Sequence, residues 1–105
     1  MKTLLLISTT VEQKEDAERI AALLLEQRLV ACAQISAPIT SLYRWQGRVT
    51  TATEWVLSLK TLPQHYPSVE KLLLREHPYE IPEIIAHEIP LVSDSYSDWV
   101  NKEVS

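Results

Sequence analysis

One histidine and one cysteine are the residues of this chain best suited to bind a metal ion. His77 stands directly before a proline at the expected end of a helix, which is a polar and accessible position. Imidazole suits copper, zinc and nickel. Cys32 is the only cysteine, and thiolate binds copper and zinc well, but a structural site needs about four ligands. His77 is therefore the leading candidate ligand, and Cys32 could contribute only if symmetry gathered several copies of it.

Each of these residues also has a simpler structural interpretation. A histidine at a helix C-terminus can cap the helix, where a positive charge is favoured. Cys32 lies between two alanines, and a free cysteine is commonly a small buried hydrophobic residue. The other two histidines, His65 and His87, are isolated in the sequence, and we expect them at the surface. Both interpretations of His77 and of Cys32 stay open at this point.

No combination of residues predicts a catalytic site. Serine, histidine and aspartate are present, but no nucleophile elbow surrounds a serine. Gly47 is the only glycine, which excludes a phosphate-binding loop and a dinucleotide fingerprint because both need several glycines. His77 and Glu83 could do acid–base chemistry, but such a pair occurs in almost any chain. We therefore expect a binding protein rather than an enzyme.

Size and charge narrow the class of protein further. The chain has 105 residues, and we expect one domain over residues 1–105. Its net charge is -4, with lysines and arginines scattered between acidic residues, which disfavours nucleic acid and membrane surfaces as partners. One cysteine allows no internal disulfide, and the apolar run at 4–7 is too short for a signal peptide or a membrane span. We expect a cytoplasmic protein.

The N-terminal half of the chain predicts a strand, a helix and a long hairpin. The apolar run at 4–7 is typical of a buried strand. Thr10 with Gln13 forms a capping-box pattern in front of a helix expected over 11–28. Alternating residues then predict extended segments over 31–45, with a break or bulge at its proline, and over 48–61. Gly47 is expected in the turn between them.

The C-terminal half predicts a helix, a strand and a short final helix. Pro67 is a favourable first helical residue, and the helix must end near His77 because Pro78 follows it. A strand is expected over 83–89, and Ser93 or Ser95 could cap the last helix. The complete order is the ferredoxin-like βαββαβ arrangement, an α+β fold, with a long central hairpin and an added C-terminal helix.

The hairpin is longer than the domain that carries it. Fourteen extended residues over 48–61 span roughly 46 Å, whereas a compact domain of this size is about 35 Å across. An overhanging edge exposes unpaired backbone groups that proteins usually cover. The hairpin also carries Tyr43, Trp45 and Trp55, and aromatic residues are enriched at interfaces. We expect an oligomer, the alternative being that Pro38 splits the strand within a monomer.

Five short segments of the chain resemble the CutA family, also called divalent-cation-tolerance proteins. They are Val30-Ala31-Cys32-Ala33, Ser41-Leu42-Tyr43-Arg44-Trp45-Gln46-Gly47, Glu54-Trp55-Val56-Leu57-Ser58-Leu59-Lys60-Thr61, His77-Pro78-Tyr79-Glu80-Ile81-Pro82-Glu83-Ile84 and Tyr96-Ser97-Asp98-Trp99. The resemblance implies a ferredoxin-like fold and a homotrimer built by strand pairing between subunits, as in PII signalling proteins. It also implies a role in tolerance of copper and other divalent cations.

The resemblance further implies a metal site, from which this chain departs at two positions. Other members are thought to bind copper through a cysteine in the first strand and a pair of histidines before Pro-Tyr. Here the first-strand residue is Ser8, and the residue before His77 is Glu76. Only His77 is kept, although Glu76 could still supply an oxygen ligand. The expected cofactor is Cu²⁺ or another divalent cation.

A second set of motif residues could line a cleft between the subunits of such a trimer. These residues are Tyr43, Trp45, Glu54, Lys60, Tyr79 and Glu83, beside His77. Lys60 could meet an anionic ligand while an aromatic side chain stacks on a ring of that ligand. Glu54 and Lys60 share one strand face but stand roughly 20 Å apart, so they cannot pair within the strand. Alternatively, Glu54, Lys60 and Glu83 form ion pairs that only hold the trimer together.

Overall fold

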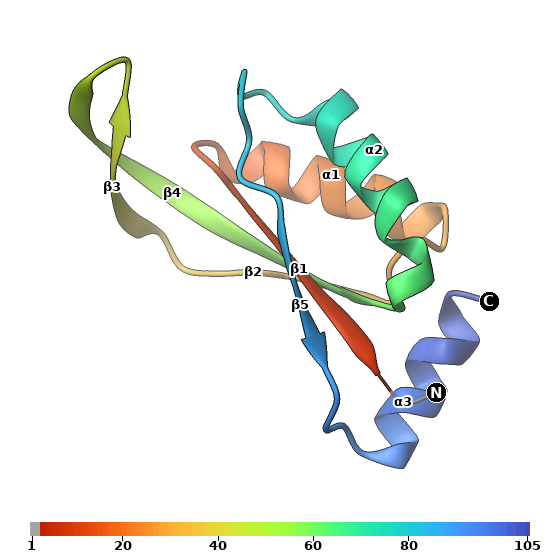
Figure 1. Cartoon of the computed structure of the whole chain (residues 1–105). Coiled ribbons are helices and arrows are strands. Elements are labelled where there is room, and N and C mark those ends of the chain that lie inside the picture. Colours follow the sequence, from red (N-terminus) through yellow and green to blue (C-terminus); the bar gives the residue numbers. More distant parts are fainter. Residues whose placement is uncertain (1–2) are drawn as a thin grey trace.

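The computed structural model of the chain describes residues 3–105. Residues 1 and 2, which precede the apolar run at 4–7, lie outside the described residues. The elements are β1 (Leu4–Val11), α1 (Lys14–Glu26), β2 (Cys32–Ile35), β3 (Ile39–Trp45), β4 (Arg48–Thr61), the 3₁₀ turn η1 (Pro63–His65), α2 (Tyr66–Glu76), β5 (Ile85–Ile89) and α3 (Asp94–Glu103) (Figure 1). None of the helices within 3–105 has the length and apolar character needed to cross a membrane.

The five strands form one antiparallel sheet in which β1 and β4 are central. The order is β2-β4-β1-β5, and β3 pairs with the outer part of β4. Helices α1 and α2 pack against one face, where Ile7 of β1 and Leu59 of β4 meet the buried Leu24 and Leu73. The sequence therefore folds as expected, as a ferredoxin-like α+β domain.

The last helix packs at one end of the other face of the sheet. Leu4 and Leu62 are buried there against Val100 and Val104. Ser93 caps this helix, since its Oγ accepts a hydrogen bond of 3.3 Å from the backbone N–H of Tyr96. The prediction of a serine cap before the C-terminal helix is confirmed.

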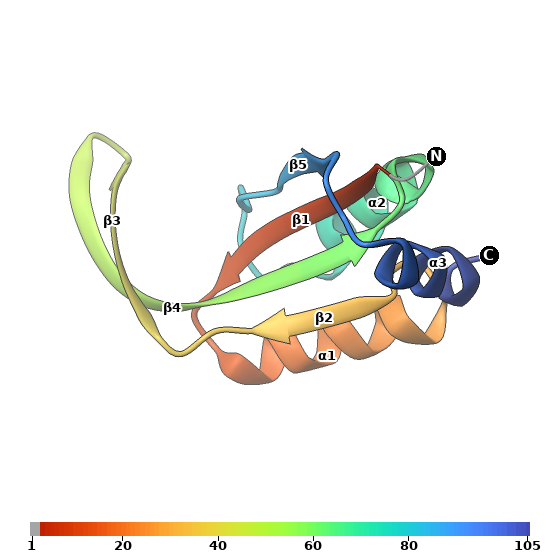
Figure 2. The same ribbon diagram turned by 90° about the horizontal axis from the view of Figure 1, so that it is seen from below.

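The hairpin extends beyond the body of the domain. Residues 55–61 of β4 pair with β1, whereas residues 48–54 pair only with β3. The chain consequently measures 45 × 26 × 24 Å, and Figure 2 shows the hairpin curling away from the sheet. The extended segment expected over 31–45 is split, because β2 ends at Ile35 and β3 begins at Ile39. The expected break at Pro38 and the expected overhang are both present, and the choice between an oligomer and a monomer stays a prediction.

The predicted capping box at the first helix is wrong. Thr10 lies within β1, which continues to Val11 and pairs there with Trp55 of β4. The helix begins only at Lys14, and the preceding Gln13 makes no side-chain cap. The strand is longer than its apolar run because the polar residues Thr9 and Thr10, which follow that run, are also buried. This extension carries Thr10 to the edge of a cavity.

Candidate functional site

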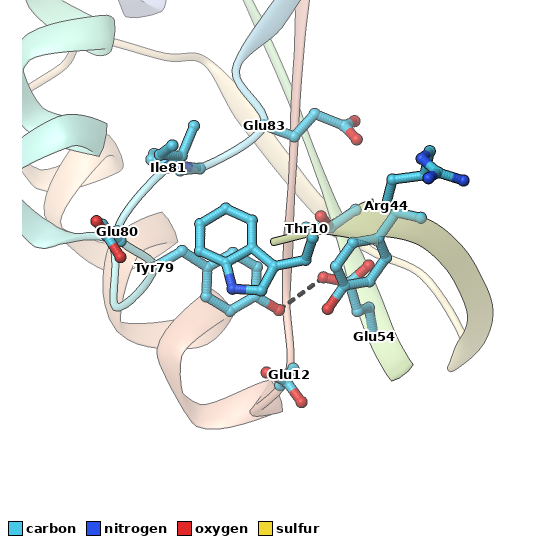
Figure 3. Close-up of a pocket in the computed structure, with 11 residues that line it drawn as sticks. Thr10, Glu12, Arg44, Glu54, Tyr79, Glu80, Ile81 and Glu83 are labelled. Atoms are coloured by element: carbon cyan, nitrogen blue, oxygen red, sulfur yellow. Dashed lines mark hydrogen bonds between the residues drawn. The ribbon is translucent and has the colours of Figure 1, made fainter. Parts of the chain in front are cut away.

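A cavity of about 540 Å³ lies between the curled hairpin, the end of β1 and the loop after α2. Figure 3 shows side chains from these three regions facing one another. The lining residues are Thr10, Glu12, Tyr43, Arg44, Trp45, Glu54, Tyr79, Glu80, Ile81, Pro82 and Glu83. The volume is in the range of sites that bind small molecules, so this is the candidate binding site.

The loop over 77–84 is fixed by local chemistry. Pro78 and Pro82 restrict its backbone, and the backbone N–H of His77 closes α2 by donating to the carbonyl oxygen of Leu73 at 2.9 Å. On the facing side, Gln46 and Gly47 both adopt positive φ angles of 50° and 78°, which gives the tight turn of a two-residue hairpin. That turn brings the end of β3 opposite the loop.

A buried carboxylate joins the hairpin to the loop. Glu54 is 5% exposed, and its Oε2 accepts a hydrogen bond of 2.6 Å from the hydroxyl of Tyr79. Burial alone would raise the pKa of Glu54, but hydrogen bonds from Ser41, Tyr79 and Thr10 and the nearby His77 together lower it. The same burial and the contact with Glu54 strongly raise the pKa of the Tyr79 hydroxyl. Glu54 is thus an anion and Tyr79 a neutral donor.

The ring of His77 packs against that of Tyr79, and both of its nitrogens take part in hydrogen bonds. Its Nε2 is 3.0 Å from the hydroxyl of Thr9 and 3.0 Å from the carbonyl oxygen of Thr10, while Nδ1 accepts from the backbone N–H of Tyr79 at 3.1 Å. The proton therefore sits on Nε2. Burial lowers the pKa of His77 despite the opposing effect of the Thr10 carbonyl, Asp16 and Glu54. A neutral ring held in this way leaves no lone pair free for a metal ion.

The structure does not bring the expected metal ligands together. Glu76 pairs with Arg19 at 2.8 Å and with Arg75 at 3.0 Å, and these charges, Arg75 first, lower its pKa. Cys32 is partly exposed on β2, opposite Lys60 of β4. Within residues 3–105, no three histidine, cysteine, aspartate or glutamate side chains are grouped so that they could hold a metal ion.

Five of the six residues expected in a cleft do line the cavity, and the sixth lies elsewhere. Tyr43, Trp45, Glu54, Tyr79 and Glu83 are among the lining residues. Lys60, near the C-terminal end of β4, donates a hydrogen bond of 2.6 Å to Oε1 of Gln34 instead. Neither of the other histidines lines the cavity: His87 is exposed on β5, and the ring of the partly buried His65 is 2.9 Å from the carbonyl oxygen of Val104.

The cavity is rich in carboxylates. Glu12, Glu54, Glu80 and Glu83 line it, against the single positive charge of Arg44. None of these five side chains takes part in an ion pair in the part of the chain that the structure describes. Unbalanced negative charge in a concave surface attracts cations. Without Lys60, the cavity is poorly suited to the anionic ligand considered from the sequence.

Several lining residues were missed by reasoning from the sequence. Glu80, Ile81 and Pro82 stand inside the motif that contributes Tyr79 and Glu83, so adjacency was a usable signal. Thr10 and Glu12 gave none, because they were read as the start of a helix. Their position became clear only from the pairing of β1 with β4.

Comparison with known proteins agrees with this architecture. Residues 5–103 match the family described as CutA1 divalent ion tolerance protein. The chain is 40% identical over 93 residues to the divalent-cation tolerance protein CutA of Thermus thermophilus, which covers 89% of this chain and 90% of the relative. It is 38% identical over 101 residues to a probable divalent-cation tolerance protein cutA homolog of Encephalitozoon cuniculi. This match covers 96% of this chain and 88% of the relative.

Solved structures give the same result. The divalent ion tolerance protein CutA1 from Ehrlichia chaffeensis matches with a TM-score of 0.94 and 36% identity, over 100% of this chain and 98% of that one. CutA from Synechococcus elongatus also matches with a TM-score of 0.94 and 34% identity. This match covers 100% of this chain and 93% of that one. The chain therefore belongs to the CutA1 family of divalent ion tolerance proteins, as its motifs indicated.

Proposed function

We propose that this chain is a homotrimeric cation-binding protein, and that the carboxylate-lined cavity beside the hairpin is its binding site for a divalent metal ion. The observation that carries the proposal is the excess of four glutamates over one arginine in a cavity of about 540 Å³. The names of the relatives, which concern tolerance of divalent cations, support the same class of ligand. The role is binding, not catalysis.

The metal ion would be held by oxygen ligands. Glu12, Glu80 and Glu83 are exposed and make no ion pair within residues 3–105, so their carboxylates are available. Carboxylates suit Mg²⁺, Ca²⁺ and Mn²⁺, whereas copper is best held by nitrogen and sulfur. Because a single chain groups no three suitable ligands in its described part, a neighbouring subunit would complete the site.

Exposed apolar side chains on the hairpin and the loop support assembly into a trimer. Leu42 is 68% exposed, Val49 is 66% exposed, and Ile81 is 70% exposed. The outer edge of β3 has no strand partner among residues 3–105. An unpaired edge with apolar side chains is suited to pairing with another copy of the chain. The second candidate function, a purely structural trimer that binds partners, rests on this surface alone.

Calorimetric titration of the purified, metal-free assembly with Mn²⁺ tests the proposed site. We expect binding that Glu83→Gln weakens about tenfold, since one charged ligand is lost. Glu26→Gln is the matched control, because Glu26 is exposed at the end of α1 and does not line the cavity. Absence of Mn²⁺ binding, or equal weakening by both variants, would contradict the proposal.

A Cu²⁺ titration of the parent and His77→Ala completes the test. We expect any Cu²⁺ affinity to survive this substitution, because both His77 nitrogens already have hydrogen-bond partners. Loss of Cu²⁺ binding in a variant that remains folded would instead place the metal on His77. In that case copper would bind at His77, and the carboxylate site would be judged by the Mn²⁺ titration alone.

A further inference from the structure

The cavity has more volume and more aromatic surface than a metal ion alone would use. Its volume of about 540 Å³ is many times the roughly 30 Å³ share of one water molecule. Tyr43, Trp45 and Tyr79 contribute three aromatic side chains to its walls. Small organic molecules are commonly bound between aromatic walls and a few polar groups.

One aromatic wall, Tyr79, is held in place, and the other two are accessible in the single chain. The hydroxyl of Tyr79 is anchored on the buried Glu54 at 2.6 Å, and its ring packs 4.7 Å from that of His77, centroid to centroid. Tyr43 is 40% exposed and Trp45 is 37% exposed. A ring that is fixed at one edge and open on the other side can receive a ligand with little loss of side-chain entropy.

The charges around these rings select for a positive ligand. Glu12, Glu80 and Glu83 line the cavity with the aromatic residues. The neighbouring smaller hollow, formed by Glu12, Gln13, Asp16, Pro78 and Tyr79, contains one more acidic residue, but Asp16 is already paired with Arg19 at 3.2 Å. The unbalanced negative charge therefore comes from the glutamates of the cavity. In Figure 3, Arg44 lies on the opposite side of the close-up from Glu80. A phosphate or nucleotide would meet repulsion here.

We propose that the cavity binds an organic ammonium ion, with the aromatic faces against its positively charged group and the glutamates Glu12, Glu80 and Glu83 around it. Aromatic rings attract cations through their negative faces, most strongly in the case of tryptophan. This proposal rests on the proposed function, because it assigns a second class of cation to the same carboxylate-lined site. Organic cation and metal ion would compete for these carboxylates.

Three probes of nearly identical shape test the charge requirement. Choline, its neutral analogue 3,3-dimethylbutan-1-ol and the anion 3,3-dimethylbutanoate are titrated into the full-length assembly by calorimetry. We expect choline to bind at least about tenfold more tightly than the alcohol, and the carboxylate not to bind. Equal affinity for choline and the alcohol would overturn the proposal, because the cavity would then recognise only apolar shape.

Two tryptophan variants locate the binding site. Trp45→Leu is expected to weaken choline binding about tenfold, whereas Trp99→Leu, on α3 and outside the cavity, should leave it unchanged. Since Trp45→Leu could disturb assembly, light scattering accompanies each titration, and Glu83→Gln provides an independent variant on the cavity wall. Choline binding that neither Trp45→Leu nor Glu83→Gln weakens would overturn the proposal.

Mn²⁺ titrated into the same samples separates this proposal from the proposed metal site. If Mn²⁺ binds and choline does not, the ammonium proposal fails while the metal site stands. If choline binds and Mn²⁺ does not, the metal site fails and the cavity is a receptor for organic cations. If neither binds, both proposals fail.

Discussion

The hydroxyl of Tyr79 donates a hydrogen bond of 2.6 Å to the carboxylate of Glu54, which is 5% exposed. These two residues are 25 positions apart in sequence and belong to different elements. Their contact ties the loop after α2 to the point where β4 leaves the body of the domain. The walls of the cavity are therefore held by a buried polar pair rather than by apolar packing alone.

Replacing Tyr79 with phenylalanine should destabilise the protein. The variant leaves a buried carboxylate without its hydroxyl partner, which costs about 1–3 kcal/mol. Tyr66→Phe is the matched control, because its hydroxyl donates to the partly buried Glu70 within one helix and should matter less. Urea unfolding at one fixed protein concentration measures the difference. Equal losses in the two variants would mean that the buried pair makes no special contribution.

Stability should decrease as the pH falls below about 6.5, the ordinary pKa of histidine. The folded-state pKa of His77 is lowered by burial, although the Thr10 carbonyl, Asp16 and Glu54 oppose the change. Between the folded and unfolded pKa values the unfolded chain binds more protons, so stability rises with pH there, by at most about 1.4 kcal/mol per pH unit. Protonation would also place an N–H on Nδ1 against the N–H of Tyr79.

Unfolding free energies of the parent and His77→Gln at pH 7.5 and 5.5 check this expectation. The parent should lose more stability than the variant over this interval. Glu54 affects stability in a separate pH range. Because its pKa is lowered in the folded state, its stabilising contribution is present above about pH 4.5 and is lost as the pH falls further. A parent and variant with identical pH profiles above pH 5 would exclude His77 as the titrating group.

Introducing a charge on the hairpin should weaken self-association. Leu42 is 68% exposed on β3, and Leu42→Asp would put a carboxylate into the apolar contact proposed between subunits. Leu74→Asp is the control, because Leu74 is 58% exposed but lies on α2. Light scattering across a dilution series should show dissociation of the first variant at concentrations where the second stays assembled. Identical masses would remove the hairpin from the interface.

The turn of the hairpin should tolerate asparagine better than alanine. Gly47 has a φ of +78°, and no atom lies within 4 Å of the position that a Cβ would take. The cost of Gly47→Ala is therefore backbone strain, about 1–2 kcal/mol, and not a clash. Gly47→Asn should cost less, since asparagine adopts positive φ more readily. Thermal unfolding of both variants measures these costs. An equal loss of stability in the two variants would indicate a cause other than the positive φ angle.

The sequence predicted the fold well because local and global signals agreed. Alternation over 48–61 matches the bounds of β4, and Pro78 ends α2 within one residue of the expected position. The error at Thr10 arose because a polar strand end and a helix cap use the same residue types. Only the pairing of Val11 with Trp55 across two strands distinguishes them, and that pairing is not local.

Part of the membership of the candidate site was predictable from the sequence, but its chemistry was not. Tyr43, Trp45, Tyr79 and Glu83 could be named from their motifs. The environment of His77 could not, because its partners Thr9 and Thr10 lie 68 and 67 positions away. Lys60 lies outside the cavity of the single chain, in the part of β4 that pairs with β1, and its place in a cleft between subunits stays a prediction.

The strand β4 serves two structures at once, with residues 55–61 in the central sheet and residues 48–54 in the hairpin. Because the outer half is paired only with β3, it can open without unfolding the core, so its local stability is expected to be far below the global value. Amide hydrogens of 48–54 should then exchange quickly when the chain is alone. Protection of these amides would report, residue by residue, how far a ligand or a neighbouring subunit has closed the cavity.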